Sequence, residues 1–160
     1  MNASAKQEEI KKYSLKADSV LFTKDSESFD DIAIPAYVLD EIPGVICGYH
    51  LGMITPKQNI FGKYIHYLFQ SKVFNYQYVI ATHGMTRFGL GKNEVQNSLI
   101  VVIPMSEQIE IVDYLDHSLK NIEVLEEKYK QQVDLLRKYK ESLISEVVTG
   151  KIDVRDYDGK

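Results

Sequence analysis

The sequence predicts an α+β fold, in which a small mixed domain is followed by one long coiled-coil α-helix. Short apolar segments interrupted by glycine and proline continue up to Pro104, as expected for strands and tight turns. Between Pro104 and Gly150 neither residue occurs, and apolar side chains repeat every seven positions. We therefore divide the chain into a domain at 1–104, a helix at 105–150 and a polar tail at 151–160.

The first half of the domain is expected to contribute two strands. Ser19–Thr23 follows a charged turn, and Ile32–Leu39 is rich in Ile, Val and Tyr, which favour strands. An acidic loop at Asp25–Asp31 separates the two. The segment Ile42–Pro56 has short apolar pieces divided by glycine and proline, which indicates further short strands.

The second half of the domain begins with a change of periodicity. Apolar residues within Asn59–Ser71 fall at helical spacing, so we expect a short amphipathic helix there. Thr82–Asn93 is a loop rich in glycine, and Ser98–Pro104 has the composition of a buried strand ended by a proline.

The long helix carries the clearest pattern in the chain. Ser106 is a suitable N-cap, and Gly150 is a suitable C-terminal stop. The 42 residues from Ser106 to Val147 would extend for ~63 Å, whereas a domain of this size has a radius of gyration of about 13 Å. Such a helix needs a partner helix; the alternative is an intramolecular hairpin that breaks near Asn121. An unbroken heptad row marks the expected pairing face: Leu115, Ile122, Tyr129, Leu136 and Leu143.

Charge is distributed unevenly along the chain, whose net charge is −4. Residues 1–104 hold ten basic and ten acidic residues, so the acidic excess lies in 105–160. No Asp or Glu occurs between Glu41 and Glu94, a stretch that suits a polyanion but also fits a sparsely charged core. Its cationic and histidine residues are Lys57, Lys63, Lys72, Arg87, Lys92, His50, His66 and His83.

The sequence contains no complete motif for catalysis or cofactor binding. The segment at 84–93 resembles a phosphate loop, but Leu90 stands where lysine is required, and Glu94 interrupts a dinucleotide fingerprint. The histidines lack partners at metal-ligand spacing, and Cys47 is single and expected to be buried. We expect no catalytic residue, no metal and no cofactor. The polar N-terminus and the lack of a long apolar run predict a cytoplasmic chain with no membrane association.

Several segments resemble the specificity subunits of type I restriction–modification systems. Pro104–Asp116 and Tyr139–Asp156 are similar to the beginning and the end of that family's conserved helix. The segment Gly84–Pro104 resembles the end of its target-recognition domain. Leu15–Thr23 resembles an earlier strand of that domain, although Ala17 replaces the glycine usual before the aspartate.

The resemblance implies a function in DNA recognition without catalysis. Such subunits normally carry two recognition domains, each followed by a long helix, and the two helices pack antiparallel as a spacer. Methyltransferase subunits bind around the helices, and a restriction subunit joins them. The resemblance implies that this chain corresponds to one half of such a subunit, with an N-terminally short recognition domain. It is then a natural truncation, a half-subunit or the C-terminal part of a longer protein.

For contacts with double-stranded DNA we predict five residues, of which Arg87 and Thr86 come first: Arg87, Thr86, Lys92, Lys63 and His83. Arginine can bind a guanine edge with two hydrogen bonds, whereas lysine more often holds phosphate. Each of these residues has the alternative of being an ordinary surface residue. Through its helix the chain is expected to form an antiparallel homodimer, or to pair with another specificity half. The competing hypothesis is a truncated assembly module that pairs through the helix without binding DNA.

Overall fold

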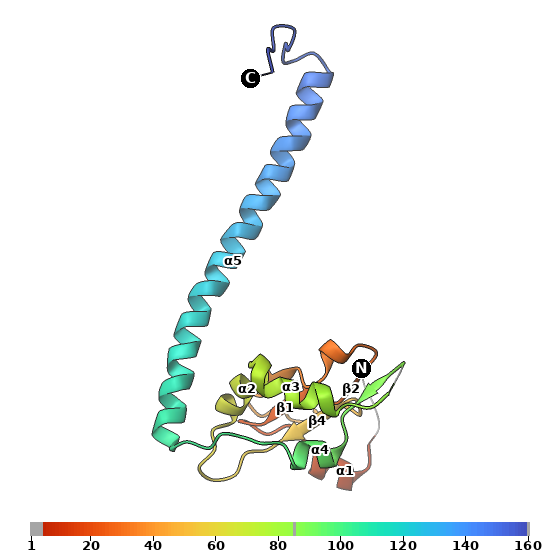
Figure 1. The fold of residues 1–160 in the computed structure, drawn as a ribbon, viewed down its shortest axis with the longest axis vertical. Coiled ribbons are helices and arrows are strands. Elements are labelled where there is room, and N and C mark those ends of the chain that lie inside the picture. The colour runs from red at the N-terminus through yellow and green to blue at the C-terminus, as the bar shows by residue number, and fades with distance from the viewer. Residues whose placement is uncertain (1–4, 85, 160) are drawn as a thin grey trace. The chain divides into compact units, whose positions relative to one another are not determined.

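The computed structural model describes residues 5–84 and 86–159 and has the predicted α+β fold, with small sheets and one long helix. Two compact units can be distinguished, one extending up to Asp113 and the other spanning Tyr114–Lys160. Figure 1 shows the short elements of the first unit and the long helix α5.

The main sheet of the first unit has three antiparallel strands. The central strand β1 (Val20–Thr23) pairs with β3 (Pro35–Tyr37) on one side and with β4 (Leu51–Ile54) on the other. The strand predicted at Ser19–Thr23 is thus confirmed. The strand predicted at Ile32–Leu39 is shorter than expected, because Ala33 has a positive φ of 59° that interrupts the extended backbone.

The segment predicted as a glycine-rich loop folds back as a hairpin. Its strand β5 (Phe88–Gly89) pairs with β2 (Asp25–Ser26), so the acidic segment also contributes a short strand. Gly84 has a φ of 135°, and a Cβ at this position would lie 1.9 Å from the Arg87 carbonyl oxygen. Only glycine can therefore occupy the turn that presents Arg87.

In the described part of the chain, four short α-helices and one 3-10 helix accompany the sheets. The predicted helix at Asn59–Ser71 is confirmed as α2 (Gly62–Gln70). The charged turn expected before the first strand is present, since the Ser19 N–H donates to the Lys16 carbonyl at 3.2 Å. The helix α1, which ends before this turn, was not predicted. Glu9 accepts a hydrogen bond from the Lys6 backbone N–H at 2.9 Å, and acidic and basic residues occupy the ends that the helix dipole favours. The remaining bounds are α1 (Gln7–Tyr13), η1 (Phe29–Asp31), α3 (Lys72–Ala81) and α4 (Lys92–Gln96).

The core lies between the three-stranded sheet and helices α2 and α3. Phe69 of α2 stacks on Tyr78 of α3 with ring centroids 5.0 Å apart and meets Phe22 of β1 at 5.5 Å. The buried Tyr78 hydroxyl donates a hydrogen bond to Ser98 Oγ at 2.9 Å. This aromatic cluster holds the helices against the sheet, and the sheet and hairpin position the loops described below.

Two expectations for less regular segments are corrected. The strand expected at Ser98–Pro104 is absent, and Leu99 is 83% exposed. Its backbone is satisfied by the Gln77 side chain, which accepts from the Leu99 N–H at 2.9 Å and donates to the Leu99 carbonyl at 3.2 Å. Cys47 is half-buried instead of buried, and partial burial raises the pKa of its thiol. No strand forms in the tail within residues 151–159.

The long helix α5 (Met105–Val148) has 44 residues. It begins at Met105, so Ser106 lies in the first turn and is not the N-cap. Gln108 is fully buried: its side chain accepts from the Phe61 N–H at 2.9 Å and donates to the carbonyls of Asn59 at 3.0 Å and Ile103 at 2.8 Å. The first turns of α5 are thereby fixed to the first unit.

The rest of α5 is continuous, so the alternative of a hairpin broken near Asn121 is excluded in this structure. The predicted stop at Gly150 is confirmed: this glycine has a φ of 75°, and the Lys151 N–H donates to the Glu146 carbonyl at 2.8 Å. In the heptad row, Leu115 is half-buried and the other four members are exposed, Leu136 by 66%. None of the helices described is long and apolar enough to cross a membrane.

Candidate nucleic-acid interface

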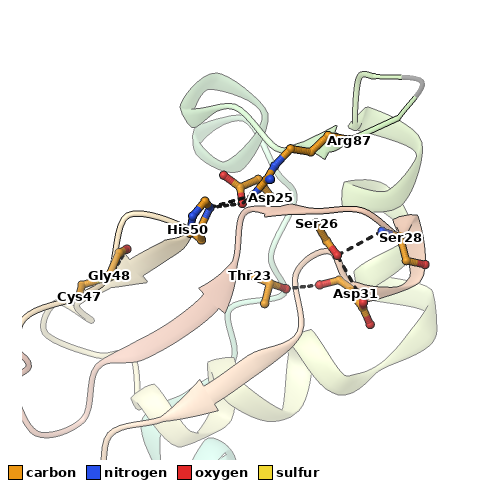
Figure 2. A network of polar contacts seen from close by, with 9 residues as sticks. All are labelled: Thr23, Asp25, Ser26, Ser28, Asp31, Cys47, Gly48, His50 and Arg87. Atoms are coloured by element: carbon orange, nitrogen blue, oxygen red, sulfur yellow. Dashed lines mark hydrogen bonds and ion pairs between the residues drawn. The ribbon is translucent and has the colours of Figure 1, made fainter. Parts of the chain in front are cut away.

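Three side chains from distant parts of the sequence meet at one polar cluster (Figure 2), which consists of Asp25, His50 and Arg87. Asp25 Oδ1 lies 2.6 Å from His50 Nδ1 and 3.0 Å from Arg87 Nη2. Arg87 Nη2 and His50 Nδ1 are themselves 3.0 Å apart. One carboxylate oxygen therefore holds both a guanidinium and an imidazole.

The backbone around the cluster explains why these residues converge. Asp25 lies in β2 directly opposite Gly89 of β5, which brings the end of the hairpin to it. Lys24, the residue before Asp25, donates its N–H to the His50 carbonyl at 3.0 Å and accepts from the Leu90 N–H at 2.7 Å. The two short strands thus join the segment before β4 to the Arg87 hairpin.

The protons of the cluster can be placed from these distances. His50 Nδ1 cannot donate to Asp25 and accept from Arg87 at the same time. A separation of 2.6 Å from a carboxylate oxygen requires a proton between the two atoms, so Nδ1 donates to Asp25. The neutral imidazole then carries its acceptor on Nε2, for which the described residues provide no hydrogen-bond donor.

Burial differs sharply within the cluster. The Asp25 side chain is 19% exposed, whereas those of His50 and Arg87 are 61% and 53% exposed. Burial by itself raises the pKa of the Asp25 carboxyl, but hydrogen bonds and charge from Arg87 and His50 outweigh it and hold this pKa below its usual value. The carboxylate is therefore ionised and recessed, and the two nitrogen-bearing side chains face solvent.

An exposed aromatic side chain adjoins the cluster. The Tyr49 ring is 81% exposed and meets the His50 ring edge-on at 5.3 Å. The Lys24 ammonium lies over the Tyr49 ring, 4.6 Å from its centroid. Cations and an exposed aromatic ring on neighbouring loops are the groups that bind phosphates and bases in nucleic-acid interfaces.

A comparison with protein families assigns the chain. The family model described as "Type I restriction modification DNA specificity domain" matches residues 2–135. The chain belongs to this family. A search of curated proteins found no match. The family's role is DNA recognition within type I systems, and it is the non-catalytic component of the complex.

Within this specificity domain, three of the predicted DNA-contact residues lie in one hairpin. His83 pairs with Gly89 across the hairpin, and Thr86 and Arg87 are exposed near its turn. Lys92 is exposed at the first position of α4, shortly after the hairpin. Lys63 lies on α2 instead, half-buried, with its ammonium 5.9 Å from the Tyr37 ring centroid.

The stretch between Glu41 and Glu94 contains no carboxylate in the sequence, but in the fold carboxylates from outside it lie beside its basic side chains. Asp25 reaches Arg87, and Glu94 lies 4.0 Å from His83, so folding brings acidic groups to two predicted contact residues. Sequence reasoning named His50 only as part of the cationic stretch and did not single out Asp25 or Tyr49. The linear charge pattern carries no signal for Asp25, because only the β2–β5 pairing joins it to Arg87. Within the described residues no group of three His, Cys, Asp or Glu could hold a metal ion.

Proposed function

We propose that this chain acts as one half of a specificity subunit, reading one half of a bipartite DNA target and directing methyltransferase and restriction subunits to it. The observation that carries the proposal is the exposed Arg87 hairpin in a chain of the DNA specificity family. The contact residues proposed are those predicted from the sequence, with Arg87 and Thr86 first. In this proposal residues 1–104 recognise DNA, 105–150 act as spacer and pairing helix, and 151–160 form a polar tail.

The pairing helix is proposed to form an antiparallel homodimer. Its apolar heptad row is exposed in the single chain, and burying it requires a second helix. Charge supports the antiparallel direction: the first half of α5 up to Glu126 has six carboxylates and one lysine, whereas the second half has five basic and four acidic residues. Antiparallel pairing places the acidic half of one helix beside the more basic half of the other, and a two-fold axis makes this interface self-complementary.

Sedimentation tests the pairing. The wild-type chain is expected to sediment as a dimer at micromolar concentration, and Leu136→Glu is expected to shift it to a monomer because it places a charge in the apolar row. Gln131→Glu is the control, since it adds the same charge on another face of the helix. A wild-type monomer at all accessible concentrations, with or without a second specificity chain, would refute the pairing.

DNA recognition is tested by selection from a pool of random duplex DNA, with the chain alone and with its methyltransferase subunit. Arg87→Ala is expected to relax the preference at one base pair, whereas Lys92→Ala should weaken binding to all sequences and reduce the salt dependence. Uniform weakening by Arg87→Ala would reduce it to a phosphate contact.

One observation favours the competing function of an assembly module: Arg87 is engaged by an internal carboxylate, while the pairing row of α5 stands exposed. In that function the helix docks methyltransferase subunits or another specificity chain, and the domain contributes no DNA binding. The same selection separates the two functions. Binding that ignores both sequence and salt, with and without the methyltransferase, favours the assembly module.

A further inference from the structure

The Asp25–His50–Arg87 cluster contains a partly buried acid at a surface expected to meet a polyanion. A carboxylate at such a surface repels phosphate, so its presence needs a physical reason. Asp25 is recessed at 19% exposure, behind two side chains that are each more than half exposed. This placement keeps the carboxylate away from a bound phosphate and directs its hydrogen bonds to the groups in front.

Asp25 restricts Arg87 by a charge-assisted hydrogen bond. A free arginine side chain loses rotamer entropy when it binds a base, whereas one held in advance loses less. Only Nη2 donates to an internal acceptor, the Asp25 carboxylate, and Nε and Nη1 have no hydrogen-bond acceptor among the described residues. Donors of the guanidinium therefore stay available to a ligand while its position is fixed.

Asp25 also selects the tautomer of His50. Because Nδ1–H donates to the carboxylate, the neutral ring has its lone pair on Nε2. The cluster then offers hydrogen-bond donors from Arg87 and an acceptor, Nε2, from His50. The two side chains adjoin, since His50 Nδ1 lies 3.0 Å from Arg87 Nη2. In the major groove a G·C pair presents the acceptors N7 and O6 on guanine and the N4 donor on cytosine. A surface with adjoining donors and acceptor complements that pair.

We propose that Asp25 is the positioning residue of the DNA interface, and that it holds Arg87 and His50 so that together they read one G·C base pair in the major groove. Arg87 donates to the guanine edge, and His50 Nε2 accepts from the cytosine amino group. This inference rests on the proposed function of DNA recognition and names the base pair and a second specificity-determining residue for it.

The test is selection from random duplex DNA with the full chain, alone and with its methyltransferase subunit, followed by sequencing of the bound DNA. The wild type is expected to enrich a motif with one G·C pair whose preference, on the order of tenfold or more, is lost in Arg87→Ala. Asp25→Asn is expected to reduce the preference at that same pair, leaving the other positions and the salt slope unchanged. The double variant Asp25→Asn/Arg87→Ala should discriminate no worse than Arg87→Ala alone, because Asp25 acts through Arg87 and His50.

Two further variants address exposed side chains and leave the fold intact. His50→Asn retains a donor toward Asp25, but its shorter amide has no acceptor at the place of the imidazole Nε2. Arg87→Lys retains the charge but lacks the planar fork. Both are expected to lose preference at the pair affected by Asp25→Asn. Asp30→Asn is the matched control, since it removes an exposed carboxylate from the same acidic segment, in η1, and should leave the motif unchanged.

The outcomes separate the inference from the proposed function. If the wild type enriches no sequence, alone or with the methyltransferase, the proposed function fails. If a motif is enriched but Asp25→Asn leaves it unchanged, tightens binding to all sequences or weakens binding uniformly, the positioning role is overturned. Should Asp25→Asn prevent folding, loss of preference at two different base pairs by His50→Asn and Arg87→Lys would still overturn the inference.

Discussion

The two compact units of this chain are stabilised in opposite ways. In the unit that ends at Asp113, Phe22, Phe69 and Tyr78 come from distant segments and exclude water from one core. In the unit that begins at Tyr114, most apolar residues belong to one continuous helix, and from Asn121 to Ser145 every residue is exposed. Local helical periodicity thus accounts for the conformation of the second unit. Its stability requires a second helix that covers the apolar row.

The largest effect is expected from Phe69→Ala, which removes the ring at the centre of the core. We expect a loss of about 3–5 kcal/mol in the free energy of unfolding of the first unit, measured by denaturant titration. Hydrogen exchange within Asn121–Ser145 should remain as in the wild type, because all of these residues are exposed and none belongs to the core cluster. Equal acceleration of exchange in both regions would show that the two units unfold together.

The next largest effect is expected from Gln108→Ala. This change leaves the Phe61 N–H and the carbonyls of Asn59 and Ile103 without their buried partner, at a cost of about 2–3 kcal/mol. Thermal unfolding followed by circular dichroism measures the loss. Gln131→Ala is the matched control, since Gln131 is an exposed glutamine of the same helix, and it should change stability little. Equal effects of the two variants would contradict a special role for Gln108.

A smaller effect is expected from Gly150→Ala at the end of α5. Alanine at a φ of 75° is disfavoured by about 1 kcal/mol, so the last turn should fray and its amides should exchange faster. Gly48→Ala serves as the comparison, because its Cβ would meet no atom within 4 Å and its φ is not positive. Unchanged exchange near Glu146 in Gly150→Ala would show that this cap does not limit the helix.

The smallest effect is expected on the pH dependence of stability, through the carboxylate of Asp25. The pKa of Asp25 is lowered in the folded state, so its stabilising contribution is present above the unfolded pKa of about 4 and is lost as pH falls through the lower folded value. The difference in melting temperature between the wild type and Asp25→Asn should therefore shrink below pH ~4. A difference that stays constant from neutral to acidic pH would mean that Asp25 has no special electrostatic contribution.

The sequence predicted the repetitive parts of this molecule better than the rest. The heptad row, the stop at Gly150 and the amphipathic helix α2 depend on local periodicity or on one backbone angle, which the sequence displays directly. The segment Ser98–Pro104 has the composition of a strand, but the Gln77 amide binds its backbone in place of a neighbouring strand. Local composition cannot show which group will form hydrogen bonds with the backbone N–H and carbonyl groups of a segment.

The candidate site was predicted only in part for a related reason. Arg87, Thr86 and His83 are close in sequence, and one glycine-rich hairpin presents all of them. Asp25 lies far from Arg87 along the chain, and a two-residue strand pair brings them together. So short a pairing leaves no periodic pattern in the sequence, although it determines the electrostatics of the site.

The hydrogen bonds of Gln108 have a consequence for exchanging recognition domains between related chains. A junction placed at Pro104, where the helix begins, would separate Gln108 from its acceptors at Asn59 and Ile103 and from its donor at Phe61. A chimaera joined after Asp113 would instead keep Gln108 together with Asn59, Phe61 and Ile103, to which it is hydrogen-bonded, and would keep the buried Val112 in the same unit. The first two turns of α5 would thus be exchanged together with the recognition domain, and the transferable spacer would begin at Tyr114.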